Sequence, residues 1–269
     1  MPFFRQFPKT NYDFFNRGVN YEIVDFFRYV NADLALLDDV SVYSYYKVQN
    51  GERPDVVSMK LYGTPEYYWT FFIINDHLKS GLANWPMSPE VFEDYMKEEY
   101  GGYAISSKVD VVVNLDGEKL ATNTLANEFP IGTPVSATHE GITTATGIVY
   151  ARNTQLAQLI IKDVVELTNP PFVETGRIIS DTHELRIEEW TEFRNAVHHY
   201  EDAEGNISYD PYYFDSVEVE GNLENLNLTP VKNYEYESKL NDERADIRII
   251  KPSLINQFAH QYRTLINAN

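Results

Sequence analysis

The chain has 269 residues, 43% hydrophobic and 23% charged, so it can bury a core and is not a disordered chain. Its 41 acidic and 22 basic residues give a formal net charge of −19, which disfavours contact with nucleic acid and with anionic lipid. The absence of cysteine excludes disulfides, thiolate metal sites and cysteine nucleophiles. The N-terminus lacks the pattern of a signal peptide, and the longest apolar run, YYWTFFII, is far shorter than the ~20 residues that span a bilayer. We therefore expect no membrane segment.

A strand and a helix are predicted first. In residues 40–48 the side chains alternate with a period of two, which indicates a strand, and Asn50-Gly51 is a turn that ends it. Pro54 suits the first turn of the helix that follows, and Gly63 can take the left-handed conformation that ends a helix. The segment before this strand, NYEIVDFFRYV, is apolar and fits either a short strand or a helical turn.

A second helix is predicted directly after Gly63. Thr64 is a suitable N-cap and Pro65 a suitable first residue. Aromatic and aliphatic residues at 67–74 occupy all sides of this helix, which is typical of a helix buried all round. An acidic amphipathic helix is predicted over residues 88–100, and Gly101-Gly102 end it.

The next stretch is rich in Gly, Thr, Val and Ile. A hairpin is predicted around Asp116-Gly117, because both residues accept positive φ. Further strands are expected near 133–138, 145–152, 156–162 and 176–181. Short strands at close, regular spacing predict a small β-barrel of the SH3 or OB kind, inserted between regions of mixed α/β character.

The last third is acidic and polar until its end. A hairpin is predicted around residues 204–206, and the stretch from Phe214 to Ala245 has few apolar anchors, so we expect an extended arm or a surface loop. The sequence ADIRIIKPS then predicts a strand, and Ser253 can cap a helix that runs to about residue 266. One apolar stripe at helical spacing is formed by Leu254, Ile255, Phe258, Tyr262, Leu265 and Ile266.

The residues give an enzyme no clear starting point. Adjacent acids at Asp38-Asp39, Glu98-Glu99 and Glu188-Glu189 do not face each other on a helix or strand, so a hydrolase hypothesis has little to rest on. His183, His198 and His199 lack the spacing of a metal site, and phosphate-binding and nucleophile motifs are absent. We therefore expect no catalytic residues, no metal and no cofactor.

The segment YYKVQNGERPDVVSMKLYGTPEYYWTFFIIND resembles a LysM module, in which a strand, a Gly turn, a helix ending in Tyr-Gly and a second helix with Trp and Asn follow one another. The residues that carry the motif are Tyr46, Gly51, Tyr62, Gly63, Trp69 and Asn75. The resemblance implies that Trp69 packs the second helix on the strand, that Asn75 ends this helix, and that the last strand lies near residues 83–87. A LysM-type peptidoglycan-binding protein, with His77, Trp85 and Tyr45 as stacking faces, is therefore one hypothesis.

A second resemblance covers more of the chain. LYGTPEYYW together with the C-terminal IRIIKPSLINQFAHQYRTLI resembles the baseplate wedge subunit family of contractile-tailed bacteriophages, the T-even gene-product fifty-three family. It implies a non-enzymatic virion protein, assembled in the host cytoplasm, that clamps adjacent wedges together around the hub in a sixfold assembly. The implied partners are other wedge proteins, sheath-initiating and inner-baseplate proteins, and hub-proximal tail proteins. Neither nucleic acid nor membrane is implied as a partner.

Together these observations predict an α+β fold: a LysM-like βααβ unit plus a C-terminal strand and helix, with an inserted SH3- or OB-like barrel. The expected domains are a docking segment (1–39), the LysM-like domain (40–103), the barrel (104–187), an acidic hairpin and arm (188–240) and the C-terminal strand and helix (241–269). The candidate interface residues are Phe3, Phe4, Phe7, Phe26, Phe27 and the apolar stripe of the C-terminal helix.

Overall fold

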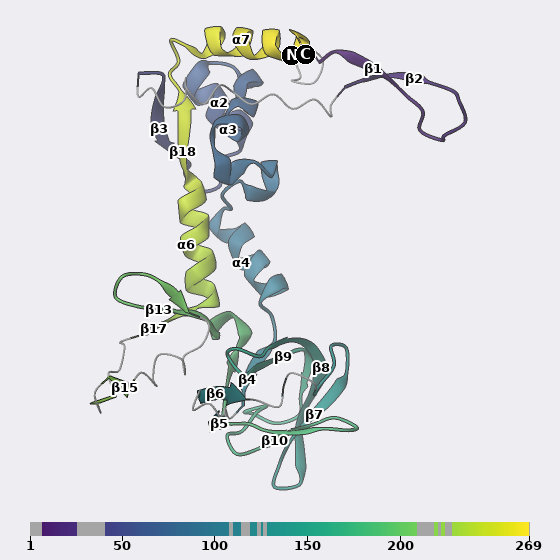
Figure 1. Cartoon of the computed structure of the whole chain (residues 1–269), viewed down its shortest axis with the longest axis vertical. Coiled ribbons are helices and arrows are strands. Elements are labelled where there is room, and N and C mark those ends of the chain that lie inside the picture. Colours follow the sequence, from purple (N-terminus) through teal and green to yellow (C-terminus); the bar gives the residue numbers. More distant parts are fainter. Residues whose placement is uncertain are drawn as a thin grey trace. The chain divides into compact units, whose positions relative to one another are not determined.

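The computed structural model describes residues 7–25, 41–107, 110–113, 119–122, 125, 128–208, 218–219, 222–223 and 228–268. The chain divides into two compact units, and both contain helices and strands, so the mixed α and β character is confirmed (Figure 1). Unit 1 comprises Met1–Phe92 and Lys239–Asn269, and unit 2 comprises Glu93–Ser238. Within the described residues, no helix combines the length and apolar character needed to cross a membrane.

Unit 1 is built from both ends of the chain. Its strands are β1 (Lys9–Tyr12), β2 (Tyr21–Val24), β3 (Tyr43–Lys47) and β18 (Asp246–Ile250). Its helices are α2 (Pro54–Tyr62), α3 (Trp69–Ile74), α7 (Ile255–Ala268) and three short 3₁₀ helices, Pro65–Tyr67, Asp76–Leu78 and Gly81–Asn84. Helices α4 (Pro89–Glu99) and α6 (Asn233–Ala245) each contain a boundary between the two units.

The strand that pairs with β3 comes from the C-terminal part of the chain. β18 lies antiparallel to β3, with Asp246 opposite Lys47 and Ile250 opposite Tyr43. The expectation of a closing strand at residues 83–87 is wrong, because this segment forms the end of a 3₁₀ helix and an extended connection. The strand, two helices and closing strand are therefore assembled from segments that lie far apart in the sequence.

The two predicted helix ends around Gly63 are present. Gly63 has φ 72°, and its N–H donates to Met59 O, which ends α2 in the left-handed conformation. Thr64 accepts a hydrogen bond from Glu66 N at 3.4 Å, as an N-cap does. The single second helix expected from Pro65 onward is instead a 3₁₀ turn followed by α3, so the aromatic segment is bent rather than continuous.

Unit 1 has two hydrophobic clusters on either side of α3. The first joins α3 to the C-terminal helix and is formed by Phe7, Trp69, Ile74, Ile250, Ile255, Phe258, Ala259, Tyr262 and Ile266. The second joins α3 to α2 and the two-stranded sheet and is formed by Val48, Val57, Phe71, Leu78, Trp85, Ala245, Ile247 and Ile249. The expectation that the aromatic helix is buried on all sides is met only in part: Trp69, Phe71 and Ile74 are buried, and the residues that remain partly exposed are Tyr67, Tyr68, Phe72 and Ile73.

Unit 2 contains a curled seven-stranded antiparallel sheet with the strand order β11-β10-β7-β8-β9-β4-β12. Its strands are β4 (Tyr103–Ser106), β7 (Pro134–His139), β8 (Ile142–Asn153), β9 (Gln158–Glu166), β10 (Arg177–Ile179), β11 (Glu184–Arg186) and β12 (Glu189–Glu192). The two edge strands, β11 and β12, are consecutive in the chain, with only Ile187 and Glu188 between them. The sheet must therefore curve until its edges come close to each other, as in a half-barrel (Figure 1).

The four strands predicted near 133–181 are present as β7, β8, β9 and β10. They enclose a core that includes Ile105, Phe129, Leu159, Phe172 and Ile178. β8 has register shifts against both neighbours, and such irregularities increase the bend of a strand. Gly147 lies at one of them, where an added Cβ would be 2.5 Å from Ile161 Cγ2, so the close packing of β8 on β9 requires glycine there.

The polar stretch after the sheet contains more structure than the sequence suggested. The predicted hairpin is present, with β13 (Val197–Glu201) paired to β14 (Ile207–Ser208), and β17 (Thr229–Lys232) pairs with the other edge of β13. Residues 233–245, expected to be part of an extended arm, form α6. Two further pairs complete the described strands: β5 (Asp110–Val113) with β6 (Lys119–Thr122), which is the hairpin predicted around Asp116-Gly117, and β15 (Glu218–Val219) with β16 (Asn222–Leu223).

Candidate functional site

Asn75 connects the aromatic helix to the C-terminal strand. It follows α3 directly and is only 3% exposed. Its Nδ2 donates to Phe71 O at 2.8 Å, which satisfies a carbonyl at the end of α3, and to Arg248 O at 3.0 Å. Its Oδ1 accepts from Arg248 N at 2.8 Å. The amide therefore pairs with both backbone groups of one β18 residue, so it ends α3 and also fixes the position of β18.

Tyr62 forms a second connection to β18. It is the last residue of α2, and its hydroxyl donates to Ile250 O at 2.9 Å. Its ring lies 5.7 Å from the ring of Tyr67 and 6.2 Å from that of Phe71. Burial is the main reason that the pKa of Tyr62 is raised above its ordinary value, so the hydroxyl stays a donor. Two neighbouring helix ends thus bind the same C-terminal strand.

Tyr46 orders the loop between β3 and α2. Its hydroxyl donates to Glu52 Oε2 at 2.6 Å, and Lys60 of α2 forms an ion pair with the same carboxylate. Burial and the hydrogen bond to Glu52 raise the pKa of Tyr46 to about 12. Burial acts to raise the pKa of Glu52, but the hydrogen bonds from Lys60 and Tyr46 outweigh it, so this pKa is lowered. The carboxylate thus stays ionised and holds the loop.

Gly51 and Trp85 pack this loop against the segment before α4. Gly51 has φ 67°, and an added Cβ would lie 2.6 Å from Ser88 Cβ and 2.7 Å from Ser88 N. Trp85 is 7% exposed, and its Nε1–H donates to Glu52 O at 2.7 Å. The suggestion that Trp85 offers a stacking face to a sugar is therefore wrong, because the ring is part of the core. Of the other two suggested residues, Tyr45 is 71% exposed and His77 is also exposed.

Trp69 packs on the C-terminal helix, in a cluster that also contains Ile250 of β18. Its ring centroid is 5.0 Å from that of Tyr262 and 6.3 Å from that of Phe258. The neighbouring Phe71, which is fully buried, lies in the other cluster, with Ile247 and Ile249 of β18. Helix α7, which the LysM resemblance does not include, packs against the Trp69 side of α3.

The candidate interface residues fall into three groups. Phe3, Phe4, Phe26 and Phe27 lie outside the described residues. Five others are buried in the core of unit 1, namely Phe7, Ile255, Phe258, Tyr262 and Ile266. Leu254 is partly buried, and Leu265 is 43% exposed. The structure thus places most of the apolar stripe of α7 against the chain itself.

A group of exposed aromatic residues that the sequence analysis missed lies on the β1–β2 hairpin. Tyr12, Phe14, Phe15 and Tyr21 are 47%, 54%, 65% and 47% exposed. The base of the hairpin is fixed to the core of unit 1 by Phe7. The signal was present in the sequence as DFFNRGVNY, an aromatic pair beside a glycine turn, but a period-two pattern does not tell which face meets water.

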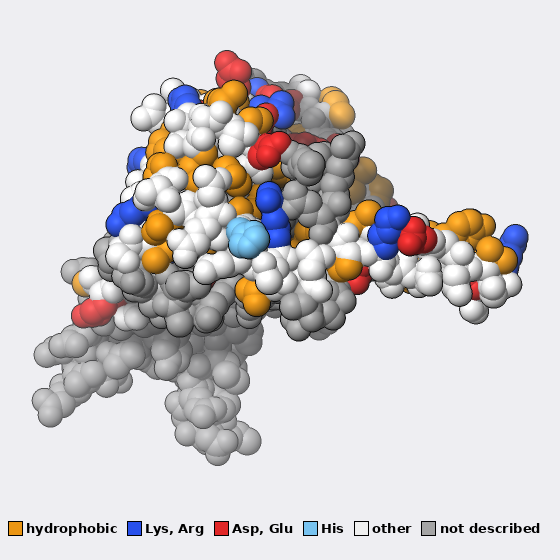
Figure 2. Space-filling model, turned by 90° about the horizontal axis from the view of Figure 1, so that it is seen from above, with side chains coloured by type: hydrophobic (Ala, Val, Ile, Leu, Met, Phe, Trp, Pro, Cys, Tyr) orange, Lys and Arg blue, Asp and Glu red, His pale blue; other side chains and the backbone are white. Residues whose placement is uncertain are grey.

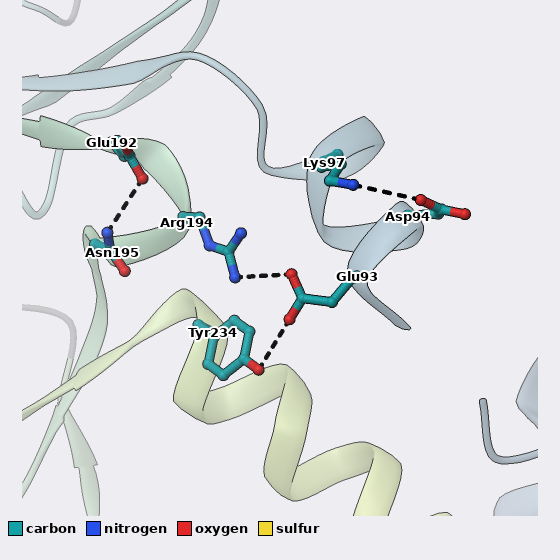
Figure 3. Close-up of polar contacts among 7 residues, drawn as sticks. All are labelled: Glu93, Asp94, Lys97, Glu192, Arg194, Asn195 and Tyr234. Atoms are coloured by element: carbon teal, nitrogen blue, oxygen red, sulfur yellow. Dashed lines mark hydrogen bonds and ion pairs between the residues drawn. The ribbon is translucent and has the colours of Figure 1, made fainter. Parts of the chain in front are cut away.

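In unit 2, Glu93 connects three segments. Its carboxylate accepts from Arg194 Nη2 at 3.1 Å and from the Tyr234 hydroxyl at 3.0 Å, so α4, the 3₁₀ helix Phe193–Asn195 and α6 meet at one side chain (Figure 3). The Arg194 guanidinium also lies over the Tyr234 ring, 4.9 Å from its centroid. The hydrogen bond from Tyr234, and then the Arg194 charge, lower the pKa of Glu93.

The histidines do not form a metal centre. His198 stacks on Tyr236 of α6 with ring centroids 4.0 Å apart, and its Nδ1 is 2.7 Å from Nδ1 of the buried His199. Burial, and then the charge of His199, lower the pKa of His198. His183 contacts Thr182 instead, at 2.7 Å. Among the side chains that the structure describes, no group of three His, Cys, Asp or Glu residues is placed to hold a metal ion.

The arrangement therefore offers a scaffold and exposed contact surfaces. Asn75, Tyr62 and Glu93 are each used to join segments that are distant in sequence. In a comparison with known families, the family described as base plate wedge protein 53 matches residues 3–130. The recognition of that family is thus confirmed over the part of the chain that includes Asn75. The search of the curated proteins found no match.

Proposed function

We propose, for this chain of the baseplate wedge protein family, that it is a non-enzymatic subunit that joins neighbouring wedges of a contractile phage tail around the hub. The observation that carries the proposal is the family match over residues 3–130. The expected location is the baseplate of the virion. The proposed partners are other wedge proteins, the sheath-initiating and inner-baseplate proteins, and hub-proximal tail proteins, in a sixfold arrangement.

The construction of unit 1 supports a scaffolding role. β3, α2 and α3 belong to the matched region, but the strand that completes their sheet, β18, comes from the other end of the chain. Asn75 and Tyr62 hold that strand through its backbone, so their contacts do not depend on the side chains of β18. A unit closed in this way can transmit a load between partners bound to different segments without opening.

We further propose that unit 1 is a LysM-like βααβ unit in which the second strand is supplied from a distance. The order of β3, α2, α3 and β18 and their antiparallel pairing support this proposal. The burial of Trp85 favours a protein-binding version over a glycan-binding one. For the half-barrel sheet of unit 2 we propose an inserted contact domain of the SH3 or OB kind, since it has a core of its own.

Reconstitution of wedge assembly tests the proposed function. The other wedge proteins would be purified with and without this chain and analysed by velocity sedimentation and negative-stain microscopy. We expect rings or partial rings of wedges only when the chain is present. Equal ring formation without the chain would contradict the proposal. Binding of the chain to one wedge without any change in wedge association would contradict the joining role but not membership of the baseplate.

A further inference from the structure

The β1–β2 hairpin has the features of a preformed docking element. Among the described residues, its two strands pair only with each other, from Lys9 opposite Val24 to Tyr12 opposite Tyr21, and they hold an eight-residue loop. A two-stranded hairpin alone is marginally stable, and exposed aromatic clusters on a soluble protein mark contact sites. Figure 2 shows hydrophobic side chains along this hairpin, which projects at the right of the view.

The hairpin loop is held in one conformation by Asp13. Its carboxylate accepts from Phe15 N at 3.1 Å and from Gly18 N at 2.6 Å. Asn16 and Gly18 both have positive φ, which the tight loop requires. Phe14 packs against Tyr12 with ring centroids 5.0 Å apart, and Phe15 remains 65% exposed. Because the rings are already ordered, little conformational entropy is lost when they bind a partner.

The hairpin tip carries one cation, Arg17, and one carboxylate, Asp13. Lys9 forms an ion pair with Glu22 at 2.7 Å, and the Asp13 carboxylate is directed to loop amides. The Arg17 guanidinium lies over the Phe15 ring at 5.5 Å and forms no ion pair with a described residue. The tip thus presents two exposed aromatic rings and a cation that forms no ion pair with a described residue, which fits a groove that offers both apolar contacts and carboxylates.

Unit 2 contains such a groove on its half-barrel sheet. The groove has a volume of about 550 Å³ and is lined by residues of β7, β8, β9 and β10 and the turn after β10. Ile148 and Ile179 line it with 39% and 37% of their surfaces exposed. Asp163 and Asp181 also line it, and neither forms an ion pair with a described residue. The volume is sufficient for aromatic side chains, since small-molecule pockets begin at about 300 Å³.

We propose that the β1–β2 hairpin of one copy docks in this groove of a second copy, with Phe14 and Phe15 on Ile148 and Ile179 and with Arg17 facing Asp163 and Asp181. Such a contact is heterologous, because different surfaces of the two copies meet. Heterologous contacts repeat from copy to copy and close into rings when the rotation allows. The inference deepens the proposed function. It rests on that function for one premise, which is that the baseplate brings neighbouring copies together.

The absence of cysteine allows a direct test on the full-length chain. Asn20→Cys places a thiol on the hairpin loop, and Thr146→Cys places one in the groove lining. The two single variants, one of them carrying a size tag, would be mixed under mild oxidation and the mixed disulfide quantified. Glu204→Cys, on the exposed loop between β13 and β14, is the matched control for Thr146→Cys. We expect at least about tenfold more mixed disulfide with Thr146→Cys than with the control if docking is specific.

Charge reversal separates docking from random collision. Arg17→Glu on the hairpin variant should lower the yield of mixed disulfide about tenfold, because it opposes both aspartates. Asp163→Lys with Asp181→Lys on the groove variant should restore that yield in combination with Arg17→Glu. Phe15→Ser should lower the yield about tenfold or more, because it removes the most exposed ring of the tip. Circular dichroism would confirm that each variant is folded.

Three outcomes would overturn the inference. The first is an equal yield from Glu204→Cys, and the second is no rescue by the reversed pair when both variants are folded. The third is a disulfide that forms only within a chain carrying both Asn20→Cys and Thr146→Cys, which would mean that the hairpin docks on its own chain. None of these outcomes affects the reconstitution of wedges, so failure of this inference and failure of the proposed function can be told apart.

Discussion

The side-chain amide of Asn75 pairs with the backbone N–H and C=O of Arg248, 173 residues further along the chain. A neighbouring strand would supply one acceptor and one donor to these two backbone groups. Here a single side chain at the end of a helix supplies both. Because Asn75 is buried, the N–H and C=O of Arg248 that face it form their hydrogen bonds with its amide and not with water. The relationship explains how a segment in the region that matches the wedge family and a segment far outside it form one unit.

Replacing Asn75 tests this connection. Asn75→Ala should lower the free energy of unfolding by about 3 kcal/mol, because it leaves buried backbone groups without partners. Chemical denaturation of the full chain, followed by the fluorescence of the tryptophans, measures the loss. Asn84→Ala is the matched control, since Asn84 is half-buried and its side chain donates a surface hydrogen bond to His77 O; its effect should stay within about 0.5 kcal/mol. Equal effects of the two changes would contradict the role given to Asn75.

Two glycines with the same backbone conformation should respond differently to alanine. Gly51 and Gly63 have φ of 67° and 72°, so alanine is strained at both, at about 1 kcal/mol. At Gly51 the new Cβ would also meet the backbone of Ser88, whereas at Gly63 nothing lies within 4 Å. Gly51→Ala should therefore cost about 2 kcal/mol more than Gly63→Ala, since the added contact cannot be relieved by a side chain. Similar melting temperatures for the two variants would show that the loop and the Ser88 segment do not pack as described.

Helix α7 should contribute to the core through one face only. Tyr262→Ala should lower the free energy of unfolding by about 3–5 kcal/mol, because it removes a buried ring beside Trp69. Leu265→Ala on the same helix should cost less than about 1 kcal/mol, because this side chain is 43% exposed. Thermal unfolding compares the two variants. A larger loss from Leu265→Ala would mean that α7 is rotated relative to the core.

The stability of unit 2 should depend on pH through Glu93. The pKa of Glu93 is lowered in the folded chain, so its stabilising effect is complete above its ordinary pKa and is lost as pH falls through the folded pKa. Glu93→Gln should therefore be less stable than the parent at pH 7, and the difference should shrink below about pH 4.

Urea unfolding from pH 7 to pH 3 measures that dependence, with Glu98→Gln as the control on the same helix. Glu98 is exposed and forms no ion pair or hydrogen bond through its side chain with a described residue. The control should therefore show no such convergence with the parent. A constant difference between Glu93→Gln and the parent at all pH values would contradict an ionic role for Glu93.

The sequence was sufficient for the elements whose signals are local. Gly63 ends α2, Thr64 caps the turn after it, and β7 to β10 lie where alternating residues and turn signals placed them. The family match over residues 3–130 confirms the recognition made from LYGTPEYYW, and the resemblance of the C-terminal segment lies outside the match. Helix caps and turns depend on a few neighbouring residues, so they can be read without knowing the fold.

The failures concern partners that are distant in sequence. The strand expected at residues 83–87 was wrong because β18 takes its place beside β3, and nothing local at residues 246–250 tells which strand it will meet. The packing of Trp69 on α7 was not predicted, because the two segments are far apart in the sequence. α6 was missed because its sequence, NYEYESKLNDERA, has no apolar stripe, and its Tyr side chains bind Glu93 and His198 instead.

The position of the chain in an assembled tail tests the central claim most directly. A cryo-electron microscopy map of the purified baseplate would show which proteins each copy contacts. We predict that every copy lies between two neighbouring wedges and contacts both, with the β1–β2 hairpin covered by protein. A copy that contacts a single wedge, or a baseplate complete without this chain, would contradict the claim that it joins the wedges.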